Sequence, residues 1–379
     1  MKIVLVGPAF PYRGGIAETT NSLYSVLTKR GHDVVIVGFK KQFPKLLFPG
    51  KTQFDTSRTD NIPSTRLLVP WNPLSWYRTA KFINKQNADL VCYKWWMPFF
   101  GACYWGVSKL LDMQSRARVA FVCHNVIPHE TRIGDKTLSK MALGQSKFFL
   151  TFSRNEAHEL EHLFPKIEKK HIRHTALPLF DRYDEFKQGQ AAARAKLKID
   201  AKKLLLFMGL IRQYKGLDIL LRAMPEIIKQ DSDIKLVIAG EFYEEQAKYD
   251  KLIDELGIRN HVIVRPGYVP ADEIGVYLAA ADVNVLPYRS ATQSAILVLA
   301  YAHGCPVITT NVGGLAEVVE AGKTGFVVEP EDSSAIASAV HNFYSTGGRT
   351  VFEPHVRTTA EKFSWDRPCE ILEEFAQSN

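Results

Sequence analysis

Residues 287–317, PYRSATQSAILVLAYAHGCPVITTNVGGLAE, have the residue types and spacing of a phosphate-binding site. An apolar run of strand length ends at Pro287, and small polar residues then open an apolar helix at residues 295–303. Free backbone N–H groups and the helix dipole both favour an anion at such a helix start. The residues at this start are Ser290, Thr292, Gln293, Ser294, Ala295 and Ile296.

A glycine pair follows the next apolar run in the same segment. Gly313 and Gly314 lie just after the buried strand at residues 307–310, and we expect another helix to open at Leu315. Two helix starts beside adjacent strand ends would form a site for a diphosphate. An ordinary strand, helix and strand unit without a ligand is an equally good interpretation of the pattern alone.

Two cations occupy a comparable position earlier in the chain. Arg212 and Lys215 follow the apolar run at residues 204–208, and Gly216 marks the helix start after them. Cations at a helix amino terminus oppose the helix dipole, so a bound anion would explain their presence. The guanidinium fork also matches phosphate geometry. The alternative is a pair of surface cations at a helix start.

Three further groups of residues follow expected strands in the first half of the chain. His124 comes directly after the run at residues 119–123, where its side chain would project into a cleft, although a capping or packing histidine is the alternative. Gly14 and Gly15 would let the backbone approach a ligand closely, but tight turns also use such pairs without a ligand. Trp95 and Trp96 could form an acceptor platform or, equally well, part of the core.

The elements that must position these residues alternate between strands and helices along the whole chain. This alternation predicts an α/β protein with two doubly wound, Rossmann-like parallel sheets that face a cleft, where ligands bind at the carboxyl ends of the strands. The expected strands are residues 2–6, 34–37, 90–93, 119–123 and 148–152 in the first domain, and 204–208, 235–240, 262–264, 283–287 and 307–310 in the second.

The end of the segment at residues 287–317 resembles the donor site of the retaining glycosyltransferases of family 4. In that family A-x-x-x-G-x-P-V-V precedes a G-G-x-x-E loop. The matching residues here are Ala300, Gly304, Pro306, Val307, Gly313, Gly314 and Glu317. The two glutamates of the family's E-x7-E motif fall at Ala291 and Leu299, so Thr292, Gln293 and Ser294 would have to contact the sugar and the ribose instead.

The resemblance assigns roles to the other groups of residues. The loop with Gly14 and Gly15 resembles a G-G-I loop that abuts the donor phosphates. Lys215 and Gly216 match a G-R-L-x-x-x-K-G segment, whose arginine position holds Leu210 while Arg212 lies close by. In the family that arginine and lysine neutralise the donor diphosphate.

Two more segments extend the resemblance. Residues 124–130 resemble a strand-end H-N-x-x-P-H-E, which would place His124 beside the transferred sugar, whereas His129 and Glu130 would only shape the loop. Tyr268 lies where family members pack the nucleobase through backbone contacts.

The resemblance also implies a domain plan. It predicts the GT-B fold, with an amino-terminal acceptor domain at residues 1–178 and a donor domain at residues 179–355. Residues 356–379 would form terminal helices that cross back onto the first domain.

The implied activity is transfer of a hexosyl group, with retention, from a nucleotide-diphosphate sugar to a hydroxyl of a lipid-linked or surface glycan precursor. No metal or separate cofactor is expected, since cations and helix amides would stabilise the leaving diphosphate. Three alternatives remain. They are a catalytically silent sugar-nucleotide-binding relative, a nucleotide-sugar epimerase of the same fold and a nucleic-acid-binding protein.

Charge is unevenly divided along the chain. Residues 1–180 have 26 Lys and Arg against 12 Asp and Glu, a net charge of +14, while the remainder carries −6. Such asymmetry indicates a polyanionic partner, either nucleic acid or an anionic membrane surface. Residues 38–53 interleave Phe43, Leu46, Leu47 and Phe48 with Lys40, Lys41, Lys45 and Lys51.

That mixture favours a lipid headgroup layer over a base-reading surface, because cations meet phosphates while apolar side chains reach below them. A solvated loop whose aromatic side chains pack on the domain is the alternative. No nucleic-acid reader motif is visible, so nucleic acid is not an expected partner.

Cysteine usage and the chain start complete the expectations. Five cysteines without a C-x-x-C pair indicate reduced thiols, and the first residues read as a strand rather than a signal peptide. We therefore expect a cytoplasmic protein, peripheral on the inner face of the membrane. The sequences DSD at residues 231–233 and GKT at residues 322–324 lie where turns are expected, so we assign neither a metal nor a nucleotide to them.

Overall fold

The computed structural model describes residues 1–44, 53–54, 62–111, 117–127, 133–179 and 185–378. Its internal contacts divide the chain into two compact units. Unit 1 comprises Met1–Ala176 with Trp365–Asn379, and unit 2 comprises Leu177–Ser364. The expected domain limits at 178 and 356 differ from these, the second by the larger amount.

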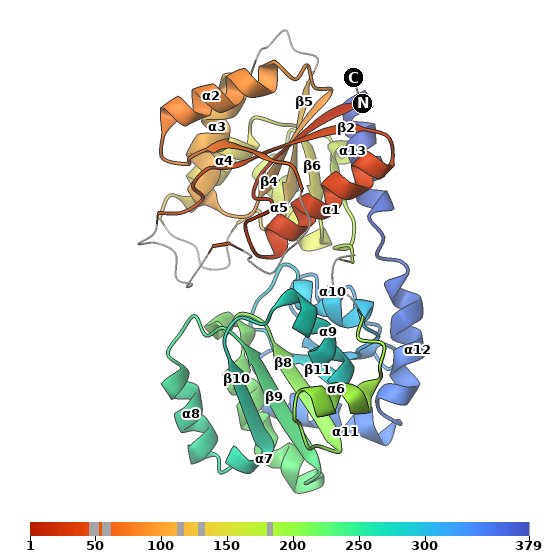
Figure 1. The fold of residues 1–379 in the computed structure, drawn as a ribbon. Helices are drawn as coiled ribbons and strands as arrows, with labels where there is room; N and C mark the ends of the chain where they lie inside the picture. The colour runs from red at the N-terminus through yellow and green to blue at the C-terminus, as the bar shows by residue number, and fades with distance from the viewer. Residues whose placement is uncertain (45–52, 55–61, 112–116, 128–132, 180–184, 379) are drawn as a thin grey trace. The chain divides into compact units, whose positions relative to one another are not determined.

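Unit 1 is built on a seven-stranded sheet with the order β3-β2-β1-β4-β5-β6-β7, in which every pairing is parallel (Figure 1). Apolar and β-branched runs such as KIVLV form its central strands, which are buried on both faces. The strands are β1 Lys2–Val6, β2 Asp33–Phe39, β3 Thr65–Leu68, β4 Leu90–Trp95, β5 Arg118–Cys123, β6 Phe148–Thr151 and β7 Ile172–His174.

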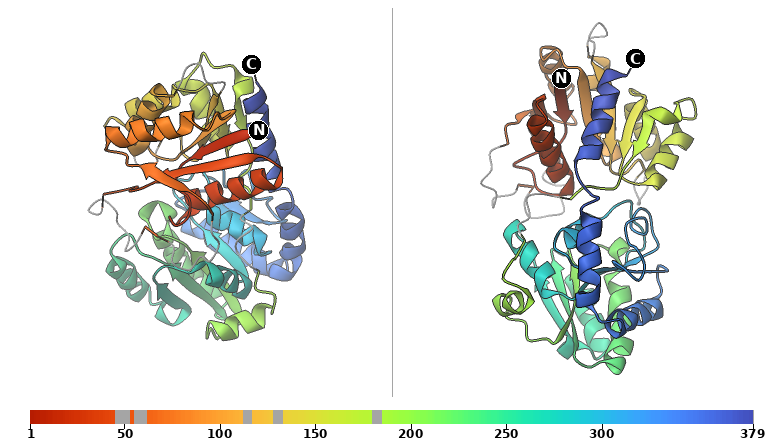
Figure 2. Two further views of the ribbon diagram at one scale, coloured as in Figure 1. Left: turned by 45° about the horizontal axis from the view of Figure 1, so that its top comes forward. Right: turned by 90° about the vertical axis from the view of Figure 1, so that its right-hand side faces the viewer.

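Helices connect these strands, as parallel pairing requires. They are α1 Gly15–Lys29, α2 Pro73–Asn84, η2 Pro98–Phe100, α3 Gly101–Lys109, α4 Asp135–Leu143, α5 Arg154–Leu163 and η3 Lys169–His171. The last helix of the chain, α13 Asp366–Gln377, also belongs to unit 1 and packs on α1, β5 and β6 (Figure 2).

Ion pairs fix α13 in this position. The carboxylate of Glu373 accepts hydrogen bonds from Arg30 Nε and His32 Nε2, each at 2.8 Å, and Arg173 pairs with Glu374 at 2.7 Å. The hydrogen bond from Arg30 lowers the pKa of Glu373 to about 2. The acidic helix therefore neutralises basic side chains of unit 1.

Unit 2 has a six-stranded sheet with the order β10-β9-β8-β11-β12-β13, again parallel throughout. An apolar cluster packs several of the helices onto it. The strands are β8 Lys203–Met208, β9 Ile234–Gly240, β10 Val262–Pro266, β11 Val283–Leu286, β12 Val307–Thr310 and β13 Gly325–Val328. The helices are α6 Gln190–Lys196, η4 Gln213–Lys215, α7 Leu217–Gln230, α8 Gln246–Glu255, η5 Arg259–His261, α9 Ala271–Ala280, α10 Ala295–Ala302, α11 Ser333–Ser345 and α12 Arg349–Ala360.

The two doubly wound parallel sheets confirm the predicted fold class. All ten expected strands are present, with ends that differ by at most two residues, and β3, β7 and β13 complete the sheets. One expected helix is wrong. Residues 313–318 form consecutive turns, in which Leu315 N donates to Val312 O and Val318 N to Leu315 O, so no helix opens at Leu315.

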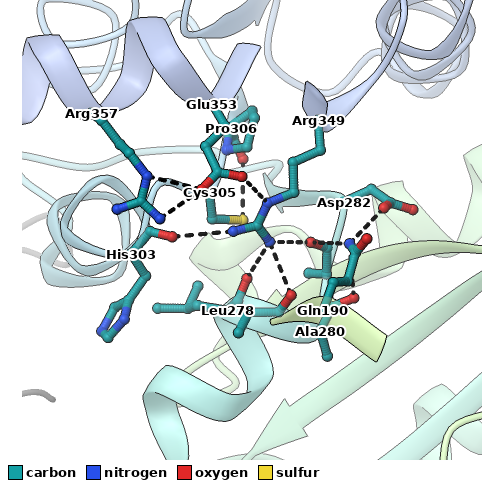
Figure 3. Close-up of polar contacts among 12 residues, drawn as sticks. Gln190, Leu278, Ala280, Asp282, His303, Cys305, Pro306, Arg349, Glu353 and Arg357 are labelled. Carbon is teal, nitrogen blue, oxygen red and sulfur yellow. Dashed lines mark hydrogen bonds and ion pairs between the residues drawn. The ribbon is translucent and has the colours of Figure 1, made fainter. Parts of the chain in front are cut away.

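A guanidinium holds α12 against the end of α9 (Figure 3). The Nη1 atom of Arg349 donates to the carbonyls of Leu278, Ala279 and Ala281 at 2.8, 3.1 and 2.6 Å. Its Nη2 atom donates to His303 O at 3.2 Å, and Nε to Glu353 at 2.9 Å. Arg349 thus satisfies carbonyls that a helix end leaves without internal donors.

We expect Arg349→Met to lower the free energy of unfolding of unit 2 by about 3 kcal/mol, because several buried acceptors lose their donor. The matched control is Arg357→Met. Arg357 also pairs with Glu353, but it is more exposed, so its replacement should cost less than about 1 kcal/mol. Urea denaturation followed by circular dichroism measures both changes, and equal losses for the two variants would contradict the assignment.

Candidate functional site

The turn after β8 in unit 2 brings Lys215 to the carboxyl edge of the sheet. Its path depends on Gly216, which has φ +67° and caps α7. A Cβ atom at Gly216 would lie 1.9 Å from the carbonyl oxygen of Pro287, so only glycine allows the turn to pack this closely on the end of β11. This close contact holds the turn that carries Lys215 against the end of β11, so two segments predicted to belong to the site lie side by side.

Lys215 is a buried cation in this turn. Its ammonium lies 5.3 Å from the centre of the Tyr288 ring. It also lies 3.1 Å from the point where a Cβ atom would stand if Gly209 carried a side chain. The same Cβ position lies 3.2 Å from Cγ1 of Ile296, in the first turn of α10. Burial lowers the pKa of Lys215, and the charge of Arg212 lowers it further. In the part of the chain that the structure describes, no carboxylate pairs with Lys215.

Arg212 begins the same turn and is partly buried. Its guanidinium carbon lies 4.8 Å from the centre of the Tyr243 ring, a cation–π arrangement that leaves the N–H edges to other acceptors. Within the described ranges Arg212 has no salt-bridge partner either. The structure therefore brings together the two cations that the sequence predicted.

A third cation, Arg289, has a different role that the sequence did not reveal. Its guanidinium forms two hydrogen bonds with Asp218, at 2.8 and 2.7 Å, and a third with Glu331 at 3.0 Å. It also donates to Gln213 O at 2.8 Å, and its backbone N–H donates to Tyr214 O at 2.7 Å. Arg289 is thus a positioning residue that holds the turn carrying Lys215.

The start of α10 lies beside this turn. Ser294 is its N-cap, and its hydroxyl oxygen accepts from Leu297 N at 3.3 Å and lies 3.3 Å from the hydroxyl of Tyr288. The first helix-internal bond is that from Val298 N to Ser294 O, so the amides of Ala295 and Ile296 have no acceptor inside the helix. Two N–H groups and the positive end of the helix dipole are available to an anion.

The glycine loop after β12 packs on the same segment. A Cβ atom at Gly313, which has φ +50°, would lie 1.6 Å from Ala291 O, and Gly314 N donates to Thr292 O at 3.0 Å. The loop therefore fixes the backbone ahead of α10, although it does not supply the second helix start that we expected.

The remaining predicted donor residues lie on this edge or near it. Thr292 and Gln293 are partly buried between β11 and α10, whereas Glu317 is exposed in the turns after Gly314. Tyr268 is exposed and follows β10, the outermost strand of the sheet.

In unit 1, His124 follows β5 and contacts the first turns of α1. Its Nε2 atom lies 3.3 Å from the hydroxyl of Thr19, and its ring centre is 5.0 Å from that of Phe152. Burial lowers the pKa of His124 well below its usual range, so the imidazole is neutral. Gly14 is the N-cap of α1 with φ +107°, and Gly15 begins the helix; both are exposed.

Comparison with known proteins identifies the family. Residues 13–175 match the model described as Glycosyltransferase Family 4, and residues 202–346 match Glycosyl transferases group 1. The chain is a family 4-like glycosyltransferase. It is similar to an uncharacterized glycosyltransferase of Methanocaldococcus jannaschii, with 25% identity over 386 residues that cover 97% of this chain and 95% of the relative.

Solved structures share the fold of this glycosyltransferase. Anabaena HepE in complex with UDP-glucose has a TM-score of 0.74 at 15% identity, over 98% of each chain. WaaG, a glycosyltransferase involved in lipopolysaccharide biosynthesis, has a TM-score of 0.69 at 18% identity, over 100% of each chain. The GT-B fold that the resemblance predicted is thereby confirmed.

A buried amine near His124 was not anticipated. Lys94 lies in β4 of the glycosyltransferase and is 0% exposed, and its Nζ atom has no hydrogen-bond partner among the described residues. Its Cβ and Cγ atoms fill the space beside Gly7. A Cβ atom added at that glycine would lie only 2.8 Å from each of them. Burial lowers the pKa of Lys94 to about 7. An unpaired lysine inside an apolar strand could have been noticed in the sequence YKWW.

Glu156 supports the loop that follows His124. Its carboxyl group accepts a short hydrogen bond from Val126 N, and burial raises its pKa to about 8. The side chain belongs to α5, whose N-cap is Ser153. Nothing in the local sequence pattern links it to residue 126, so sequence reasoning could not find it.

Trp95 and Trp96, for which an acceptor platform and a core position were equally expected, differ in burial. Trp95 is fully buried, and its indole N–H donates to Val126 O at 3.3 Å. Trp96 is partly buried, with its ring 4.3 Å from that of Phe100. Trp95 belongs to the core because β4 is central in the sheet, so it cannot present a surface to an acceptor, whereas Trp96 packs against the core and keeps part of its surface exposed.

The predicted basic segment is described only in part. Lys40 and Lys41 are exposed at the end of β2, while Phe43 packs on Phe99 with ring centres 5.6 Å apart. The predicted residues Lys45, Leu46, Leu47, Phe48 and Lys51, together with His129 and Glu130, lie outside the described residues.

Two further findings concern metals and membranes. No group of three or more His, Cys, Asp or Glu in the described ranges could hold a metal ion, and Asp231 and Asp233 each pair with a lysine. Among the helices of those ranges, none is both long and apolar enough to cross a bilayer.

Lys94 gives a prediction about stability and pH. The folded lysine loses its proton near pH 7, whereas the unfolded side chain keeps it up to about pH 10, so stability should rise with pH between these values. Below about pH 7 both states bind the proton, and the cost of the buried charge applies in full.

Lys94→Met should therefore be more stable than the wild type at neutral pH and lack this part of the rise. Urea denaturation at several pH values measures the difference between the two proteins, and an exposed lysine, Lys140→Met, is the control. A pH dependence that is unchanged in Lys94→Met would show that the amine does not titrate as argued.

Proposed function

We propose that this glycosyltransferase moves a hexosyl group from a nucleotide-diphosphate sugar to a hydroxyl, with retention at the anomeric carbon. The observation that carries the proposal is the pair Arg212 and Lys215, without a carboxylate partner in the described ranges, beside the free amides at the start of α10. The UDP-glucose complex of HepE supports a nucleotide-sugar donor for a protein of this fold.

The electrostatics favour a diphosphate over a neutral ligand. Burying an unpaired ammonium costs free energy, which a bound anion would return. Negative charge builds on the diphosphate as the glycosidic bond breaks, so two cations and two amides that are already in place stabilise the transition state more than the ground state. We propose that these groups make a metal ion and any separate cofactor unnecessary.

The donor sugar needs hydrogen-bonding partners other than the missing glutamates. Ala291 and Leu299 are buried and carry no polar side-chain atoms. Ser294 uses its hydroxyl oxygen as the N-cap of α10, which leaves Thr292 and Gln293 as the side chains proposed to meet the sugar and the ribose. Tyr268 and Glu317 remain proposed contacts of the base and of the donor.

We also propose that retention is achieved without a protein nucleophile. We propose that the acceptor hydroxyl attacks from the face that the diphosphate leaves, and that a departing phosphate oxygen takes its proton. The bond from the anomeric carbon to the phosphate oxygen breaks as the bond to the acceptor oxygen forms. The neutral imidazole of His124 would accept a hydrogen bond from a hydroxyl of the sugar or the acceptor, or donate one to it.

The proposed acceptor is a lipid-linked or surface glycan precursor, bound by unit 1. We propose that the enzyme works in the cytoplasm, on the inner face of the membrane, with Lys40 and Lys41 among the cations that face it. The role of WaaG in lipopolysaccharide biosynthesis supports an acceptor of this class for a protein of this fold.

Donor binding should depend on both cations. We expect Lys215→Met and Arg212→Gln each to weaken the affinity for nucleoside diphosphates at least tenfold, or about 1.4 kcal/mol, because each removes one charge next to the phosphates. Isothermal titration calorimetry with UDP, GDP and ADP in turn measures the effect.

Lys202→Met is the matched control for these variants, since Lys202 is an exposed lysine of unit 2 that pairs with Asp233. It should bind as the wild type does. If no nucleoside diphosphate binds the wild type, or if Lys215→Met binds normally, the proposed donor site is wrong.

His124 should affect turnover more than donor binding. His124→Ala is expected to lower kcat at least about tenfold, through the lost hydrogen bond in the transition state, with little change in nucleotide affinity. His158→Ala, at an exposed position of the same unit, is the control.

The measurement is nucleotide release from the donor with and without acceptor. Donor binding without acceptor-dependent release would favour the catalytically silent relative, and interconversion of free donors would favour the epimerase. Full activity in His124→Ala would remove the residue from the mechanism.

A further inference from the structure

The outer face of α2 and the neighbouring end of α3 form an exposed surface of mixed aromatic and basic character. We define the α2–α3 face by its residues, which are Trp71, Leu74, Tyr77, Arg78, Lys81, Lys85, Trp105, Lys109 and Leu110. Ten large apolar side chains are exposed in the described ranges, and five of them belong to this face. The concentration marks the face as an interaction surface.

The exposed apolar side chains are large and far from buried. The exposed fractions are 46% for Trp71, 56% for Leu74 and 52% for Tyr77. Those of Trp105 and Leu110 are 37% and 45%. A soluble protein rarely gathers side chains of this size at one place without a partner.

Helical spacing puts the apolar and basic side chains of α2 on the same side. Leu74, Tyr77, Arg78, Lys81 and Lys85 fall within an arc of about 100° on a helix of 3.6 residues per turn. The opposite side carries the buried residues Ser75, Thr79, Ala80 and Ile83. Since α2 is already anchored through that buried side, its outer side is not needed for packing.

Helix α3 extends the face because it packs directly on α2 (Figure 1). A Cβ atom at Gly106 would lie 2.5 Å from the Trp76 ring, so the two helices are in close contact there. Asn84 Nδ2 donates to Leu110 O at 3.2 Å, which joins their carboxyl ends. Trp105, next to Gly106 in the chain, is therefore carried on the same rigid pair of helices.

The charges of this region are unbalanced. Residues 61–111 contain six Lys and Arg and a single acid, Asp89, whose carboxylate accepts from Lys2 N at 2.7 Å. In the described part of the chain, Arg78, Lys81, Lys85 and Lys109 have no carboxylate partner. An anionic partner would complement this surface over its whole length.

We propose that the α2–α3 face binds the surface of an anionic lipid bilayer. Tryptophan and tyrosine favour the level of the headgroups, where the ring is half in hydrocarbon, and lysine and arginine extend past them to the phosphates. The face is formed by two helices that pack on each other, and both carry exposed aromatic and basic side chains. The partner is thus a membrane rather than a peptide held in a groove.

The place of the face in unit 1 connects it to the acceptor. Helix α2 begins five residues after the end of β3, so Trp71 and Leu74 lie at the carboxyl edge of the sheet, the edge that also carries Gly14, Gly15 and His124. Docking through this end would bring the acceptor side of unit 1 to a lipid-borne hydroxyl. This last step rests on the proposed function, whereas docking itself does not.

The experiment is vesicle flotation of the full chain without donor or acceptor, so its failure is distinct from failure of the proposed activity. Vesicles of phosphatidylcholine alone are compared with vesicles containing about 30% phosphatidylglycerol, at about 0.1 M and about 0.5 M salt. The wild type should float only with the anionic vesicles, and the bound fraction should fall at high salt.

Two sets of variants separate charge from aromatic contact. We expect Arg78→Gln/Lys81→Gln/Lys85→Gln to lower the partition coefficient at least tenfold. Each cation near an anionic membrane surface contributes about 1 kcal/mol to binding, and this variant removes three. Trp71→Ala/Tyr77→Ala should also float less, with the residual binding more sensitive to salt. The control Lys202→Gln/Lys235→Gln/Lys251→Gln changes three lysines of unit 2 and should float as the wild type does.

Fluorescence gives a second readout that a merely unfolded variant would not reproduce. Emission from Trp71 and Trp105 should shift to the blue and be quenched by brominated lipid on addition of anionic vesicles. Trp71→Phe/Trp105→Phe should remove most of the quenching and still float, because phenylalanine keeps the apolar contact.

Several results would overturn the proposal. They are a wild type that does not float, variants of the face that float normally, and capture by oligonucleotides or by an acidic protein in place of vesicles. Normal flotation of the Arg78, Lys81 and Lys85 variant would assign membrane binding to another segment.

Discussion

Every strand of a parallel sheet ends at the same edge, and this constraint decides where the chemistry of the protein can lie. In unit 2 the neighbouring strands β8, β11 and β12 lead to the turn of Lys215, the start of α10 and the loop of Gly313. These segments are far apart in sequence and become adjacent only because their strands pair. A helix that starts at this edge also points its free amides and its dipole toward the same place.

At the carboxyl edge of the sheet in unit 2, Arg289 holds the fold, whereas Arg212 and Lys215 have no carboxylate partner in the described ranges. Arg289 donates hydrogen bonds to Asp218, to Glu331 and to the turn that carries Lys215. Burial alone would raise the pKa of Asp218, but the hydrogen bonds from Arg289 lower it. Among the described residues, Lys215 has no carboxylate partner in the turn that Arg289 holds. Sites that retain an uncompensated charge depend on stability supplied elsewhere, here by the apolar core of the unit.

Sequence reasoning located the strands because buried parallel strands are continuous apolar runs. It missed β3, TRLL, and β7, IRH, since these short strands at the two sides of the sheet mix polar with apolar residues. It expected a helix after Gly314 because a glycine pair before an apolar residue resembles a helix start, yet consecutive four-residue turns satisfy the backbone there.

The candidate site was predictable where a residue follows a strand and not where it acts across the fold. Lys215 and His124 were found because strand ends are visible in the pattern. The contact of Glu156 with Val126, and that of Arg289 with Asp218, join residues from different elements, which periodicity cannot relate. For Trp95 the sequence left a platform and a core position equally open, because an aromatic residue at a strand end has the same pattern whether it faces the core or solvent; the structure places it in the core.

The positive charge of unit 1 is unevenly distributed over its elements. Unit 1 has 27 Lys and Arg against 16 Asp and Glu, and part of this excess is offset locally, since α13 places Glu373 beside Arg30 and His32 and Glu374 beside Arg173. No such acidic element covers α2 in the described ranges, where the exposed cations alternate with tryptophan, leucine and tyrosine. A net charge kept only for solubility would not need large apolar side chains among the cations, because these oppose it. Part of the charge asymmetry of the sequence is therefore concentrated on the α2–α3 face, where Arg78, Lys81, Lys85 and Lys109 are exposed.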